Sequence, residues 1–162
     1  MADITNDYYA SASSGWDYST DVRGEPDGTY AREMNTASQT TYLTCSGFNI
    51  NDIPEGAVIS KVELESKVYS TEASCSVGII ARINGTDQGS YVSTGATWPT
   101  VITKTYTSGD LLVAANLAEG VFSVRVKGVL PTGGGTNYAD YLKVSVTYNL
   151  PSQTGLEMGC NF

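Results

Sequence analysis

The chain of 162 residues contains no histidine. Without histidine, the chain acting alone builds neither a Ser-His-Asp unit nor a Cys-His unit for nucleophilic catalysis. It offers no histidine ligand to zinc, and its three cysteines are too few for a tetrahedral all-cysteine site. The commonest hydrolytic and zinc-dependent chemistries are therefore excluded for this chain by itself.

Positive charge is scarce as well. Nine Lys and Arg residues stand against seventeen Asp and Glu residues, which gives a formal net charge of −8. Nucleic acids and anionic membrane surfaces are bound mainly through clustered basic residues, whereas the basic residues of this chain are scattered. We therefore expect neither a nucleic-acid partner nor a membrane partner. The first residues show no secretory leader, and no apolar run is long enough to cross a bilayer.

The cysteines are few and odd in number. Cys45 and Cys75 lie in strand-like stretches, so we expect them to be buried and to behave as small apolar residues. A bridge between these two remains open, because sequence alone does not supply the geometry of a disulfide. Cys160 lies in a polar tail and is the cysteine most suited to pairing with another chain.

Period-2 alternation of apolar and polar residues dominates the sequence from Gly15 onward. In the clearest segment, residues 58–69, apolar side chains share one parity and charged side chains share the other. Successive side chains of a strand point to opposite faces, so this segment is predicted to have one buried and one wet face. Its predicted buried row consists of Val58, Val62, Leu64 and Val68.

Further segments have the same pattern and are separated by turn residues. They are residues 75–83, 100–107, 121–130 and 139–148. Asn84-Gly85 predicts a type I′ turn, which would pair residues 75–83 with residues 88–92 in a hairpin. Residues 110–119 predict only a helical turn or irregular crossover. About seven or eight half-apolar strands are most simply buried as an all-β fold, a two-sheet antiparallel β-sandwich of jelly-roll-like type. We predict this domain over residues 15–150, with an N-terminal arm (1–14) and a C-terminal tail (151–162).

Six stretches of the chain carry a resemblance to a known family. They are Gly15-Trp16, Asp27-Gly-Thr-Tyr-Ala31, Tyr42-Leu43, Gly47-Phe48, Ile53-Pro-Glu-Gly-Ala-Val-Ile59 and Asp140-Tyr-Leu-Lys-Val-Ser-Val-Thr-Tyr148. In order and spacing they resemble a β-sandwich domain of tailed-bacteriophage virion proteins, also seen in bacterial surface proteins. The chain departs from that pattern after Trp16, where Asp17-Tyr18 replaces the usual Asn-Pro, and at 116–119, where Asn-Leu-Ala-Glu stands for the usual Asp-Leu-Asn.

The resemblance implies a structural virion protein, most simply a capsid decoration or cement protein on the outer shell. Such a protein would be made in the bacterial host cytoplasm, be located in the virion, form a homo-oligomer and bind the major capsid protein or another virion protein. The two terminal segments would then contact neighbouring subunits, and deletion of residues 1–14 would abolish capsid binding while leaving the domain folded. The interface residues expected there are Tyr8, Tyr9, Met158, Cys160 and Phe162.

The alternative function is a glycan-binding or adhesion module of a phage fibre or tail appendage. Tyrosine is abundant, and its flat amphipathic ring suits contact with proteins or sugars. This alternative predicts exposed aromatic side chains beside polar groups on one sheet or loop set. The tyrosines expected to be accessible are Tyr8, Tyr9, Tyr18, Tyr91, Tyr106, Tyr138 and Tyr141.

Catalysis and metal binding find little support in the sequence. No two carboxylates are marked as a glycosidase pair, and on the wet face of residues 58–69 Glu63 and Glu65 are balanced by neighbouring lysines. Acidic residues gather at Asp17, Asp21, Glu25 and Asp27, but they lack the spacing of an EF-hand loop and are interpreted as a solvated, turn-capping stretch. We expect no enzymatic activity, no metal and no cofactor.

Overall fold

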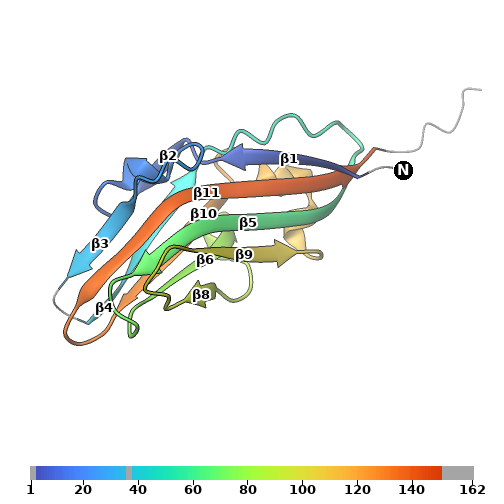
Figure 1. The fold of residues 1–162 in the computed structure, drawn as a ribbon. Helices are drawn as coiled ribbons and strands as arrows, with labels where there is room; N and C mark the ends of the chain where they lie inside the picture. The colour runs from blue at the N-terminus through green and yellow to red at the C-terminus, as the bar shows by residue number, and fades with distance from the viewer. Residues whose placement is uncertain (1–2, 36–37, 151–162) are drawn as a thin grey trace, which may run out of the picture.

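Two antiparallel sheets pack face to face in the computed structural model, which describes residues 3–35 and 38–150 (Figure 1). The predicted two-sheet, jelly-roll-like β-sandwich is confirmed. Sheet A has the order β1 (Ile4–Tyr9), β11 (Gly135–Asn149), β5 (Val58–Ser70) and β9 (Thr100–Tyr106), and β3 (Ala31–Asn35) also pairs with β11. Sheet B has the order β2 (Ala12–Ser14), β4 (Gln39–Ser46), β10 (Phe122–Leu130), β6 (Ser76–Ile83) and β7 (Thr86–Asp87), and β8 (Val92–Thr94) also pairs with β6.

The helical content of the described residues is limited to three short 3-10 segments. They are η1 (Ser19–Val22), η2 (Asp110–Leu112) and η3 (Ala114–Leu117). The last two confirm the irregular crossover predicted over 110–119. No helix within residues 3–35 and 38–150 has the length and apolar character needed to cross a membrane.

The core lies between the sheets and is built from the predicted apolar rows. Each long strand contributes every second side chain, and these side chains are fully buried because the opposite sheet covers them. The rows include Val62 and Leu64 of β5, Val124 and Val126 of β10, Val77 and Ile79 of β6, and Val144 and Val146 of β11.

The start of β5 departs from the predicted row. Val58 was expected to face the core, but it is 64% exposed, whereas Ile59 is 4% exposed. The pairing with β11 shifts here: Lys61 lies opposite Thr147, yet Ile59 lies opposite Tyr148. This irregularity places one additional β5 residue between two pairs, and the extra residue reverses the parity of the strand.

The predicted N-terminal arm is wrong for the described residues. β1 pairs with β11 along residues 4–9, and β2 pairs with β4. Tyr8 is only 8% exposed, and its hydroxyl donates a hydrogen bond to the Asp52 carboxylate. The segment is therefore part of both sheets rather than a free contact arm. The predicted C-terminal tail, 151–162, lies outside the described residues.

The turn after β6 forms as predicted, but its partner strand begins earlier. Asn84 and Gly85 have φ angles of 49° and 76°, the positive values that a type I′ turn requires. β7 follows at once and pairs Thr86 with Ile83. The predicted partner strand, residues 88–92, is instead mostly a loop that leads to β8. The hairpin partner of β6 after the turn is β7, which is only two residues long.

Cys45 and Cys75 are buried as predicted, and both are free thiols. Burial raises the pKa of the Cys45 thiol to about 12, because the thiolate loses its hydration inside the core. At a pH of about 8, an ordinary thiol is partly ionised and reacts with iodoacetamide. We expect Cys45 to stay unmodified in the folded protein and to react fully in urea, as measured by peptide mass spectrometry. Equal rates in both conditions would contradict the burial of Cys45.

Candidate functional sites

The outer face of sheet B brings together cationic and aromatic side chains from four segments. Tyr42 and Lys127 lie opposite one another on β4 and β10, while Arg125 lies between Thr44 of β4 and Ile80 of β6. Strand parity directs these side chains away from sheet A. We define the sheet B cluster as Tyr42, Arg82, Asp87, Tyr91, Arg125 and Lys127.

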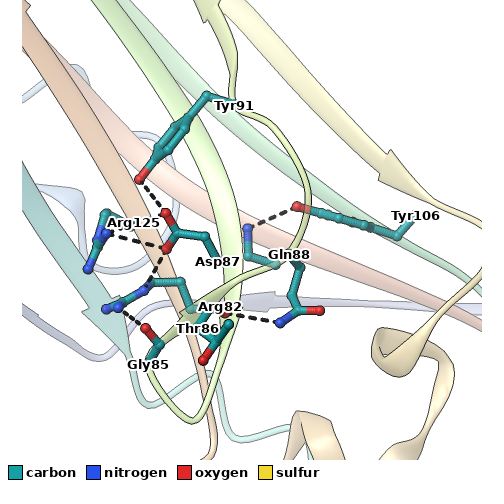
Figure 2. Close-up of polar contacts among 9 residues, drawn as sticks. Arg82, Gly85, Thr86, Asp87, Gln88, Tyr91, Tyr106 and Arg125 are labelled. Carbon is teal, nitrogen blue, oxygen red and sulfur yellow. Dashed lines mark hydrogen bonds and ion pairs between the residues drawn. The ribbon is translucent and has the colours of Figure 1, made fainter.

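Asp87 is the centre of this cluster (Figure 2). Its Oδ1 lies 2.8 Å from Arg82 Nε and 3.3 Å from Arg125 Nη1. The Tyr91 hydroxyl donates to Asp87 Oδ2 at 3.3 Å. The hairpin fixes the position of this carboxylate, since the Gln88 N–H binds the Ala81 carbonyl at 2.9 Å. One carboxylate thus orients two guanidinium groups and a phenol.

Two tyrosine rings lie beside the cations of the cluster. The guanidinium carbon of Arg125 is 4.5 Å from the ring centroid of Tyr42, and Lys127 Nζ is 5.3 Å from that of Tyr91. Tyr42 remains 44% exposed, so much of its ring is open to a ligand. Burial raises the pKa of Tyr91, so its hydroxyl stays protonated and able to donate at neutral pH.

The cluster is packed onto the sheet and carries excess positive charge. Ile80 lies on the outer face opposite Arg125, yet it is completely buried, so side chains on this face cover it. The side chains of Arg82 and Arg125 are only 17% and 21% exposed. Three cations and one carboxylate give 3 − 1 = +2 on this face of a chain whose net charge is −8. Such held donors are well suited to an anionic ligand.

The outer face of sheet A is instead neutralised by its own ion pairs. Glu63 lies 3.7 Å from Lys61, Glu65 lies 3.2 Å from Lys143, and Lys67 lies 3.6 Å from Asp140. The predicted balance of charge on this face is therefore present. Its aromatic residues also contact one another, since Tyr69 and Tyr138 stack with ring centroids 4.3 Å apart and Tyr30 meets both rings edge-on.

The predicted accessible tyrosines divide into two groups. Tyr18 is 60% exposed, and Tyr9, Tyr91 and Tyr138 are half-buried. Tyr8 and Tyr141 are buried, contrary to prediction, and each hydroxyl donates a hydrogen bond to a carboxylate, Asp52 and Glu65 respectively. Tyr8 belongs to the inward row of β1. Half-buried Tyr106 uses its hydroxyl to accept the Ala81 N–H at 3.0 Å.

The predicted interface residues do not form one surface in the described part of the chain. Tyr8 is buried toward the core, and Tyr9 lies on the outer face of sheet A, opposite Lys143. Met158, Cys160 and Phe162 lie outside the described residues. Tyr42 was missed by the sequence prediction, although its parity, opposite to that of Leu43 and Cys45, indicates an outward side chain.

The acidic stretch after Trp16 forms no metal centre among the residues described. Within 3–35 and 38–150, no group of three or more Asp, Glu, Cys or His residues is arranged to hold an ion. Asp27 caps a turn as predicted: its Oδ1 accepts the Thr29 N–H at 2.8 Å and the Thr29 hydroxyl at 2.6 Å. These hydrogen bonds to the charged form lower the pKa of Asp27.

No protein-family model matches the chain, and no curated protein matches it in sequence. Solved structures similar in fold include several carbohydrate-binding modules. The family 29 module CBM29_1 from Piromyces equi is 10% identical, with a TM-score of 0.46, over 90% of this chain and 91% of the module. The module TmCBM61, solved with β-1,4-galactotriose, is 9% identical, with a TM-score of 0.46, over 86% of each chain. CBM35 from Paenibacillus barcinonensis is 11% identical, with a TM-score of 0.44, over 90% of this chain and 99% of the module. At these values, the function of this chain has to be inferred from its own surface.

Proposed function

We propose that the protein is a non-catalytic glycan-binding module that takes an acidic glycan on the sheet B cluster. The observation that carries this proposal is the placement of Arg125 and Lys127 beside the rings of Tyr42 and Tyr91, with Asp87 holding the arginines. Exposed Tyr42 beside these polar groups supports the glycan-binding alternative, which predicts exposed aromatic side chains next to polar groups on one sheet.

The chemistry of the cluster fits an acidic sugar in two respects. A tyrosine ring offers a rigid apolar surface to the C–H groups of a sugar ring, and its hydroxyl can bond the sugar's polar groups. A guanidinium presents several N–H donors in one plane, which match the two oxygens of a carboxylate.

Charge favours this face over the rest of the protein as the contact surface. The chain carries −8 overall, so an anionic polymer is repelled at long range. Close contact then depends on a local positive surface. The sheet B cluster supplies one, because its three cations and one carboxylate leave an excess charge of +2. Sheet A offers no such excess in its described ion pairs, because Lys61, Lys67 and Lys143 each lie beside a carboxylate.

The proposed role is binding rather than hydrolysis. Glycoside hydrolysis generally needs two carboxyl groups on either side of the scissile bond. The sheet B cluster contains one carboxylate, Asp87, and two arginines and a tyrosine already engage it.

The capsid-decoration role implied by the virion resemblance stays a prediction. The predicted contact of Tyr8 with a neighbouring subunit is not available, because Tyr8 lies buried in β1. The predicted contacts of Met158, Cys160 and Phe162 lie outside the described residues, and a glycan-binding face is compatible with a place on a fibre or tail.

Affinity electrophoresis with two forms of one polymer tests the proposed function. We expect the native protein to be retarded by polygalacturonate and not by the fully methyl-esterified polymer, which has the same backbone without the charge. Added salt should weaken the retardation, because the contact includes ion pairs. Equal retardation by both polymers would refute the preference for acidic sugars. No retardation by either polymer, together with no binding to a panel of sulfated and neutral glycans, would refute glycan binding itself.

A further inference from the structure

Away from the sheet B cluster, a cleft lies at the edge of the sandwich, between β3 of sheet A and the first half of β4 of sheet B. Its volume is about 180 Å³, and its walls include Trp16, Asp17, Arg32, Glu33, Gln39 and Thr41. Thr41 and Tyr42 are neighbours in β4 and therefore point to opposite faces of sheet B. The edge cleft, defined by the six residues above, is thus separate from the sheet B cluster.

Unpaired polar atoms concentrate around the edge cleft. Five buried side-chain polar atoms in the described residues have no hydrogen-bond partner, and three of them belong to this wall: Trp16 Nε1, Arg32 Nε and Thr41 Oγ1. Trp16 is only 6% exposed. Buried donors without acceptors cost free energy, and native proteins rarely leave them unpaired. The Arg32 side chain leaves β3 on the face opposite to Glu33 and reaches the Tyr18 hydroxyl. Trp16 Nε1 and Thr41 Oγ1 are two unpaired atoms on the inner side of the cleft, and they indicate a polar occupant.

The same cleft contains carboxylates with spare acceptor capacity. Glu33 is 6% exposed and accepts only neutral amide donors among the described residues, Gln39 Nε2 at 3.1 Å and Asn137 Nδ2 at 3.3 Å. Each carboxylate oxygen can accept more than one hydrogen bond. Asp17 is held nearby by its backbone, whose carbonyl accepts the Arg32 N–H at 2.9 Å.

Gly128 of β10 lies next to two residues of the cleft wall, Trp16 and Glu33. A Cβ atom at this position would lie 2.8 Å from the Trp16 ring and 2.9 Å from Asn137 Nδ2, and it would also meet the Glu33 carboxylate. Only a residue without a side chain lets Trp16, Glu33 and Asn137 converge here. The polar wall is therefore built into the packing of the sandwich edge.

We propose that the edge cleft binds a single uncharged sugar residue through adjacent hydroxyl groups. A hydroxyl can accept from Trp16 Nε1 and donate to Glu33 or Asp17, which matches a wall that has both an unpaired donor and free acceptors. An anionic group fits poorly, because two carboxylates and one guanidinium line the cleft. The volume lies below the usual range for drug-sized ligands, so one ring fills it. The ligand class rests on the proposed function, but the site does not depend on the sheet B cluster.

The indole N–H signals of the two tryptophans test this site directly by NMR. The native protein is titrated separately with glucose, galactose, mannose and N-acetylglucosamine up to about 100 mM, since a single small ligand binds weakly. We expect at least one sugar to shift the Trp16 signal saturably. The Trp98 signal is an internal control and should not move, because Trp98 is 67% exposed and lies outside the cleft wall. If none of the four sugars shifts Trp16, the proposal is wrong and water is the occupant.

Matched variants separate the two sites. Thr41→Val removes the unpaired hydroxyl at nearly constant shape and should weaken the sugar response of Trp16 by about 2- to 10-fold. Thr40→Val on the same strand is the control, because Thr40 is exposed and points away from the cleft. Arg125→Gln should leave the response of Trp16 unchanged even if polygalacturonate binding is lost. Loss of the response in Arg125→Gln, or an unchanged response in Thr41→Val, would overturn the proposal.

Discussion

Replacement of Arg125 by glutamine should weaken binding to polygalacturonate by about 10- to 100-fold, the effect of losing a hydrogen-bonded charge pair. The substitution keeps a polar side chain of similar reach but removes the guanidinium that lies between the Tyr42 ring and the Asp87 carboxylate. Isothermal titration with a short oligogalacturonate measures the change. Circular dichroism of the variant checks that the sandwich remains intact.

Lys61→Gln is the matched control for Arg125→Gln. It removes the same unit of positive charge, but from the outer face of sheet A, where Lys61 pairs with Glu63 at 3.7 Å. We expect less than about a twofold change in affinity, because an exposed charge on the far face acts only through screened long-range attraction. If both variants lose affinity equally, overall charge rather than the sheet B cluster determines binding.

Deletion of residues 1–14 should destabilise the domain by at least about 3 kcal/mol, since each buried large side chain removed from a core costs about 2–5 kcal/mol. The deletion removes β1 and β2, buried Tyr8 and Ala10, and the backbone pairing of β1 with β11. It also removes Asn6 and Tyr8, which lie opposite Val146 and Val144 in sheet A. Unfolding in urea, followed by tryptophan fluorescence, gives the free energy of unfolding.

A shorter deletion of residues 1–3 serves as the control for this experiment, because these residues precede β1. We expect its urea midpoint to match that of the full chain. If the 1–14 deletion also unfolded at the urea midpoint of the full chain, that result would contradict the role of β1 in the sheet. The interpretation of residues 1–14 as an arm would then be restored.

The strands that could be predicted from sequence are those with one plainly apolar face. Val124 and Val126 in β10, and Val144 and Val146 in β11, alternate with polar residues and are all buried as predicted. β1 was missed because its inward row, Ile4, Asn6 and Tyr8, contains a polar residue at its centre. A strand of that composition is held by pairing with β11, and such a long-range contact leaves no local periodicity in the sequence.

The candidate site was only partly accessible to sequence reasoning. The Asn84-Gly85 turn predicts that Arg82 and Asp87, which flank it, lie close together, as they do at 2.8 Å. Arg125 and Tyr42 come from β10 and β4, which are far away along the chain. Their meeting depends on the order β4-β10-β6 within sheet B, and several orders of these strands would bury the same apolar rows.

Titration of the folded protein with a short oligogalacturonate, followed by amide NMR, tests whether the sheet B cluster binds an acidic glycan. We expect saturable shifts at Tyr42, Asp87, Tyr91 and Arg125, with residues of the opposite face, such as Glu65 of sheet A, unchanged. Shifts confined to sheet A, or no shifts at ligand concentrations of about 10 mM, where even weak sites fill, would contradict it.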